Sequence, residues 1–160
     1  MTFQPFDTKH TSALLQLNEA SVEATSPLDE ARLGTLLEQG CQITVAETNG
    51  AVKGMLMVFT EGSEYNSVNY QWFNKKFKSF AYIDRIVIGA AYRGQGAGQQ
   101  FYQRLKQQTL GEGRRWVTAE INLQPPNETS LVFHQKQGFV ELGTQSVGSK
   151  VVSLQACELD

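Results

Sequence analysis

The sequence predicts a single mixed α/β domain that covers residues 1–160. Two apolar segments at 42–48 and 52–59 flank Asn49-Gly50, the dipeptide typical of a tight β-hairpin. A β-branched segment at 81–88 leads into a glycine-rich loop and then into a segment with helical periodicity. Because strands and helices alternate from this point on, the fold class is α/β rather than all-α or all-β.

The first half of the chain predicts two helices before the hairpin. We expect a short strand at 3–6, a helix at 8–19, and a second helix that opens at Pro27 and stops at Gly40. Residues 61–80 break the pattern, because they are polar yet carry Tyr65, Tyr70, Trp72, Phe73, Phe77 and Phe80. These aromatic side chains either close an extra piece of core or form a wall of a substrate pocket.

The second half predicts a strand at 81–88, a helix at 96–110, a strand at 115–121, a helix at 127–137, and strands at 140–144 and 151–159. Asn127 is a good N-cap after two prolines, and Gly138 is a good C-cap. The connection from the strand at 81–88 to the strand at 115–121 passes through a helix, so these two strands should be parallel.

The composition is that of a soluble globular protein, with 41% hydrophobic and 19% charged residues. A net charge of −2 gives no general attraction to nucleic acid or to an anionic membrane. The first twenty residues contain Asp7, His10 and Glu19, which argues against a signal peptide, so the default expectation is cytoplasmic. We expect Cys41 and Cys157 to be buried reduced thiols, and we expect no metal.

The most informative segment is the loop between the strand at 81–88 and the helix that follows it. Arg93-Gly94-Gln95-Gly96-Ala97-Gly98 places several backbone N–H groups at a helix start with few side chains in the way. Such donors, at the positive end of the helix dipole, suit a phosphate or a pyrophosphate. The spacing fits neither a Walker loop nor the Gly-x-Gly-x-x-Gly dinucleotide motif.

Two segments resemble motifs of the GNAT superfamily of N-acetyltransferases. Residues 88–98 resemble the acetyl-CoA-binding motif of that family. A second motif of the family resembles residues on the segment 127–139, namely Asn127, Ser130, Phe133, His134, Lys136 and Gly138-Phe139. The sequence of this segment is similar to that of a bacterial subgroup of predicted acetyltransferases. The resemblance covers nearly the whole chain. It implies a central, mostly antiparallel sheet flanked by helices, in which the fourth and fifth strands are parallel and splay apart.

The resemblance also implies acetyl-CoA as co-substrate. The amides from Arg93 to Gly98 would hold its pyrophosphate, and backbone groups of the preceding strand would contact the pantetheine arm. That strand segment is Ile86, Val87 and Ile88. A backbone N–H near Ile88 would polarise the thioester carbonyl. From the second motif, the expected cofactor contacts are Asn127, Ser130, Phe133 and Lys136.

Acetyl transfer to an amine needs a base and gains from an acid. Asp84 is the first candidate base, since strict alternation places it on the face of Ile86 and Ile88; alternatively it pairs with Arg85 and only shapes the site. Glu120 on the next strand is the rival. Many family members carry a tyrosine, the general acid, at the position of His134. This histidine either donates a proton to the leaving thiolate or only lines the site through hydrogen bonds. Tyr82 and Tyr92 are the alternatives.

The expected function is therefore N-acetyl transfer from acetyl-CoA to an amine of a small molecule or a peptide, by direct attack in a ternary complex. O-acetyl transfer or use of a longer acyl chain stays within this class. The alternative class is a non-catalytic acyl-CoA-binding sensor or regulatory module with the same fold. No nucleic acid or membrane partner is expected, and a homodimer is left open.

Overall fold

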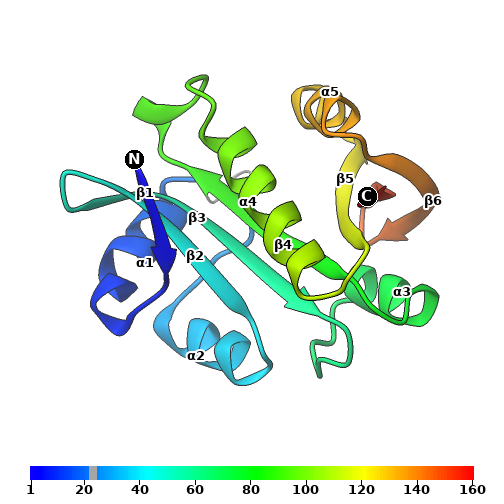
Figure 1. Cartoon of the computed structure of the whole chain (residues 1–160), viewed down its shortest axis with the longest axis horizontal. Helices are drawn as coiled ribbons and strands as arrows, with labels where there is room; N and C mark the ends of the chain where they lie inside the picture. Colours follow the sequence, from blue (N-terminus) through cyan, green and yellow to red (C-terminus); the bar gives the residue numbers. More distant parts are fainter. Residues whose placement is uncertain (22–24) are drawn as a thin grey trace. The chain divides into compact units, whose positions relative to one another are not determined.

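The computed structural model describes residues 1–21 and 25–160, which form a mixed α/β fold with a seven-stranded sheet (Figure 1). The strand order is β1-β2-β3-β4-β5-β7-β6. Of the strand pairs with a defined register, β4–β5 is parallel, and β1–β2, β2–β3, β5–β7 and β6–β7 are antiparallel. The predicted fold class and the parallel fourth and fifth strands are confirmed.

The strands are β1 (Thr2–Pro5), β2 (Gln42–Thr48), β3 (Ala51–Thr60), β4 (Ala81–Ile88), β5 (Trp116–Gln124), β6 (Val140–Val147) and β7 (Lys150–Glu158). The α-helices of the described residues are α1 (Thr11–Glu19), α2 (Glu30–Glu38), α3 (Val68–Lys76), α4 (Ala97–Gly111) and α5 (Glu128–Lys136). Short 3-10 turns lie at Thr8–His10 and Ala90–Tyr92.

The chain divides into two compact units. Unit 1 contains Met1–Phe59 and Asp84–Phe101, and unit 2 contains Thr60–Ile83 and Tyr102–Asp160. Strand β4 passes from unit 2 into unit 1 at Asp84. Within unit 2, β4 pairs with β5 through Ala81 with Val117 and Tyr82 with Thr118.

Unit 1 is built on the β2–β3 hairpin. Asn49 and Gly50 both have positive φ, 53° and 78°, as the two-residue turn requires. The predicted second helix starts later than expected, at Glu30 rather than Pro27, because the side chain of Asp29 accepts the N–H of Arg32 and caps the helix there.

Unit 2 contains the aromatic insert, and part of it is a helix that the sequence pattern did not reveal. Ser67 caps α3, whose Tyr70 and Phe73 are fully buried. Arg114 anchors the start of the insert through Glu61 at 2.9 Å and lowers the pKa of that carboxyl. The caps of α5 are as predicted: Asn127 accepts the N–H of Ser130, and Gly138 has φ of 91°.

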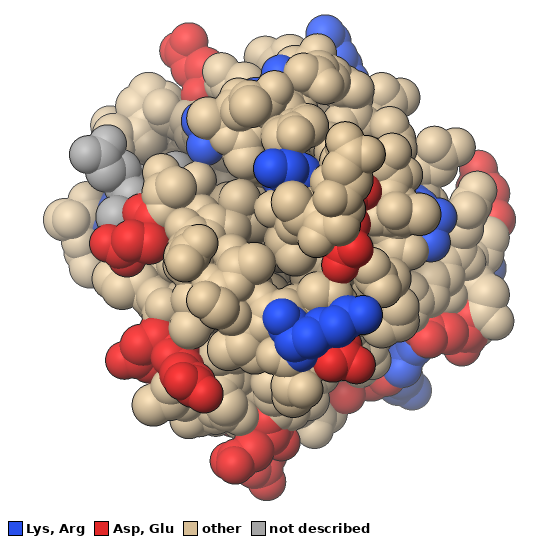
Figure 2. All heavy atoms as spheres, turned by 90° about the vertical axis from the view of Figure 1, so that its left-hand side faces the viewer, with Lys and Arg blue, Asp and Glu red and all other residues tan. Residues whose placement is uncertain are grey.

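The surface carries both signs of charge. On the face shown in Figure 2, Lys and Arg side chains are interspersed with Asp and Glu. No helix in the described parts of the chain is long and apolar enough to cross a bilayer.

Cys41 and Cys157 are free and buried, as predicted. Burial and the charge of Asp84 raise the pKa of the Cys41 thiol to about 12.

Candidate active site

The glycine loop of unit 1 is open and conformationally specialised. Gly94 and Gly96 have φ of 75° and 83°, a region that side-chain-bearing residues rarely adopt. A Cβ added at either position would meet no atom within 4 Å, so the loop backbone is uncovered. Helix α4 starts at Ala97, and the N–H groups of a first helical turn lack intrahelical partners. The loop therefore fits an anion such as a pyrophosphate.

The side chain of Arg93 folds back onto unit 1. Its Nε donates to the carbonyl oxygen of Ile88 at 3.1 Å, and a terminal nitrogen donates to Ser21 Oγ at 3.1 Å. Gln95 donates to the carbonyl oxygen of Ala91 at 3.0 Å. These bonds tie the loop to the end of β4, so its backbone is held in place before any ligand binds.

Strand β4 alternates as the sequence predicts. Counted as whole residues, Asp84, Ile86 and Ile88 are partly exposed, whereas Arg85 and Val87 between them are buried. Asp84 thus shares a face with two of the residues expected along the pantetheine arm.

Asp84 also has the ion pair that the alternative interpretation requires. Its Oδ2 lies 3.4 Å from Arg85 Nε, and the two side chains are only 8% and 7% exposed. Arg85 donates further to Asn18 Oδ1 and the carbonyl oxygen of Ser26, both at 3.0 Å, and to Ser26 Oγ at 2.7 Å. Asn18 is fully buried and donates to the same Ser26 carbonyl. Asp84 is therefore held beside a guanidinium that α1 and the segment before α2 fix in place.

Glu120, the rival base, belongs to unit 2. It is half-buried on β5, and its Oε2 accepts the hydroxyl of Tyr82 at 2.6 Å. Tyr82 is fully buried, which holds the carboxylate in one orientation.

The second-motif residues lie on α5 in unit 2. Asn127 caps the helix, Ser130 and Phe133 are half-buried on it, and Lys136 is exposed near its end. The Phe133 ring meets the Tyr102 ring edge to face, with centroids 5.0 Å apart. The predicted capping role of Asn127 is confirmed, and its contact with a cofactor stays a prediction.

His134 is buried, whereas a proton donor to the CoA sulfur would have to face the cleft. Its side chain is surrounded by the rings of Tyr102, Phe133 and Phe139. Nδ1 lies 2.7 Å from the carbonyl oxygen of Ser130, which can only accept, so Nδ1 carries the proton. Nε2 then accepts the hydroxyl of Tyr102 at 2.7 Å. Both ring nitrogens thus have partners inside unit 2, an arrangement that favours a structural role over proton donation.

Burial lowers the pKa of His134, so the imidazole stays neutral in the folded protein when free histidine is protonated. As pH falls from about 7.5 to about 5.5, His134 becomes protonated in the unfolded chain but not in the native chain, and the free energy of unfolding decreases. We expect His134→Gln to flatten this loss, by up to about 1.4 kcal/mol per pH unit. Denaturant unfolding at several pH values measures the slopes; equal slopes in the variant and the wild type would contradict the assignment.

The sequence did not reveal two groups of residues that form hydrogen bonds with the predicted site residues. Tyr102 follows Phe101 on α4, and its distance of 32 positions from His134 hides the pair in the sequence. Asn18 and Ser26 reach Arg85 from 67 and 59 positions away. The one sign in the sequence was the Asp84-Arg85 pair itself, because two charged residues inside a largely apolar strand must find partners when they are buried.

The described residues contain no group of three His, Cys, Asp or Glu side chains that could hold a metal ion. A family model described as "Acetyltransferase (GNAT) family" matches residues 11–139. The chain belongs to the GNAT acetyltransferase family. This assignment agrees with the two motifs, since the matched range contains both the glycine loop and α5.

Solved structures show the same fold for this GNAT protein. A GNAT acetyltransferase from Streptococcus pneumoniae has a TM-score of 0.74 at 19% identity, with 99% of each chain covered. The ribosomal-protein-S18-alanine N-acetyltransferase from Escherichia coli gives 0.74 at 14% identity, covering 99% of this chain and 94% of that one. The protein yncA from Salmonella typhimurium, solved with its cofactor acetyl-CoA, gives 0.73 at 19%, covering 99% and 94%. Comparison with curated protein sequences gives no match.

Proposed function

We propose that this GNAT protein is an N-acetyltransferase that moves an acetyl group from acetyl-CoA to an amine of a small molecule or a peptide, by direct attack in a ternary complex. The observation that carries the proposal is the open loop at the start of α4, with positive φ at Gly94 and Gly96 and a backbone anchored by Arg93. Family membership supplies the chemistry that such a loop serves.

In this proposal the loop holds the pyrophosphate through backbone N–H groups and the dipole of α4. Backbone groups of β4 lie along the pantetheine arm, and residues of α5 supply further contacts. The β4 residues are Ile86, Val87 and Ile88, and the α5 residues are Asn127, Ser130, Phe133 and Lys136. Acetyl-CoA supplies the activated acyl group. The protein binds acetyl-CoA and provides the side chains that accept and donate protons.

The transfer forms a C–N bond, breaks the C–S bond, and moves one proton from the amine and one proton to the sulfur. We assign the first proton to Asp84, which shares the face of Ile86, and keep Glu120 as the rival base. The second proton is assigned to Tyr92 in place of His134, because Tyr92 is half-exposed directly before the loop whereas both nitrogens of His134 are engaged. Tyr82 is a weaker acid candidate because its hydroxyl already donates to Glu120.

The decisive test of the function is thiol release from acetyl-CoA over a panel of amino acids, polyamines and peptides with free N-termini. Amine-dependent release, with the acetylated amine detected by mass spectrometry, is the expected result. Tight binding of acetyl-CoA with no release over the whole panel would instead favour the sensor or regulatory module.

We expect Gly96→Val to weaken CoA binding by about tenfold or more, equivalent to roughly 1.4 kcal/mol. The reason is that φ of 83° is strained for any residue with a Cβ, and the β-branched side chain would also crowd the phosphate site. Calorimetry with CoA measures the change. Gly111→Val is the matched control, because Gly111 lies at the far end of α4, lacks a positive φ and has no atom within 4 Å of an added Cβ. Equal affinities of the two folded variants would refute the loop assignment.

A further inference from the structure

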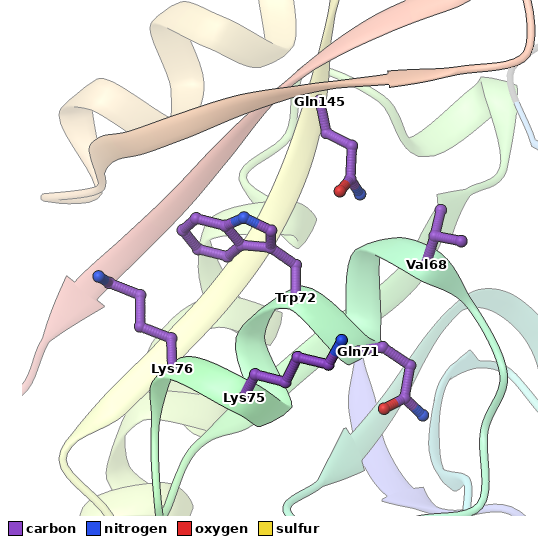
Figure 3. A pocket seen from close by; sticks show the side chains of 6 residues that line it. All are labelled: Val68, Gln71, Trp72, Lys75, Lys76 and Gln145. Carbon is purple, nitrogen blue, oxygen red and sulfur yellow. The ribbon is translucent and has the colours of Figure 1, made fainter.

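Unit 2 contains an open pocket between helix α3 and strand β6, and none of the residues assigned to acetyl transfer lines it (Figure 3). Its volume is about 490 Å³, within the range of small-molecule sites. The residues that line it are Val68, Gln71, Trp72, Lys75, Lys76 and Gln145. All but Gln145 come from the aromatic insert, whose helix the sequence pattern did not reveal.

One wall of the pocket is the indole of Trp72, which rises from α3 toward β6 in Figure 3. A Cβ added at Gly143 of β6 would lie 3.1 Å from Trp72 Cζ2, so the glycine lets the indole approach the strand closely. The fully buried ring of Phe73 meets the indole edge to face, with ring centroids 5.2 Å apart. Trp72 itself is half-exposed, so the indole presents a flat apolar surface to solvent while its packing against Gly143 and Phe73 holds it in place.

The polar lining is cationic and amide-rich. Lys75 and Lys76 contribute two ammonium groups, and no ion pair found among the described residues uses either of them. Lys76 Nζ lies over the Trp72 ring, 5.6 Å from its centre, so its charge faces the indole. Gln145 Nε2 donates to Asn69 Oδ1 at 3.0 Å, which fixes the amide that reaches down from β6.

We propose that this pocket binds a small molecule in which a carboxylate is attached to a flat apolar group. The flat group would stack on Trp72, and the carboxylate would be attracted by the ammonium group of Lys76 beside the indole, with Lys75 on the other side adding positive charge to the pocket rim. None of the residues described as lining the pocket is acidic, so a cationic amine would meet two like charges and no counter-charge. The pocket shares no residue with those assigned to acetyl transfer, and the proposal does not depend on acetyl transfer.

The probe for this site is 2-naphthoate, compared with the neutral 2-naphthamide and the cationic 2-naphthylmethylamine. Each is titrated into the full chain while the indole N–H signals of Trp72 and Trp116 are followed by NMR, with Trp72→Phe assigning the first. Naphthoate should shift the Trp72 signal and bind at least about tenfold more tightly than the amide, with an affinity that falls as salt is raised. Binding should persist in Gly96→Val, which separates this site from the CoA loop.

Charge-removal variants make the test specific to the pocket. The double variant Lys75→Gln, Lys76→Gln should lower naphthoate affinity by about tenfold. Lys78→Gln is the matched control, because Lys78 is exposed just after α3 and does not line the pocket. The proposal is overturned if amide or amine binds as tightly as naphthoate, or if Lys78→Gln weakens binding as much as the double variant.

Discussion

Replacing Arg85 with Gln is expected to lower the free energy of unfolding by about 3–5 kcal/mol, the usual cost of breaking a buried ion pair from one side. The guanidinium is 7% exposed and pairs with the carboxylate of Asp84. Its loss removes the buried counter-charge of Asp84 and leaves the fully buried Asn18 without this donor. A Gln side chain is neutral and cannot match the several hydrogen bonds that the planar fork of arginine makes.

Denaturant unfolding measures the change, with Arg115→Gln as the control because Arg115 is exposed. The control should stay within about 0.5 kcal/mol of the wild type. The loss of unfolding free energy for Arg85→Lys should lie between those of Arg85→Gln and Arg115→Gln, since lysine keeps the charge but lacks the several N–H donors of the planar guanidinium. A loss below about 1 kcal/mol for Arg85→Gln would mean that the pair is solvated like an exposed one.

Elements whose signals are local in sequence could be predicted closely. Asn49-Gly50 fixed the hairpin, and the glycines after Arg93 placed the start of α4. Helix α3 could not be predicted, because its buried residues include Asn69, whose burial depends on a hydrogen bond from Gln145 in a strand 76 positions later. An isolated pattern of polar and aromatic residues gives no sign of that partner.

The candidate site follows the same division. Alternation along β4 predicted that Asp84 and Ile86 share a face, because that geometry depends only on the strand itself. The burial of His134 depends on Tyr102, which another helix supplies. The partners of Arg85 likewise come from α1 and the segment before α2. Side-chain direction on a strand is therefore readable from sequence, whereas the hydrogen-bond partner that decides between structure and catalysis is not.

The last prediction concerns the base. Asp84→Asn should lower kcat/KM by about a hundredfold near neutral pH, the usual contribution of a general base. Without an internal proton acceptor the reaction depends on the fraction of amine that is already neutral. That fraction grows as pH rises toward the pKa of the amine, so the defect should shrink at high pH. The measurement is the pH profile of kcat/KM for the best acceptor found in the thiol-release panel.

Two further variants separate the roles that the structure leaves to Asp84. If this carboxylate only balances Arg85, then Asp84→Asn and Arg85→Gln should lower kcat/KM by similar factors at every pH, because each removes one charge of the same 3.4 Å pair. If it is the base, only Asp84→Asn should show a defect that fades as pH rises. Glu120→Gln tests the rival: wild-type activity of Asp84→Asn at all pH values, together with a pH-dependent loss in Glu120→Gln, would transfer the role to the carboxylate that Tyr82 holds in place.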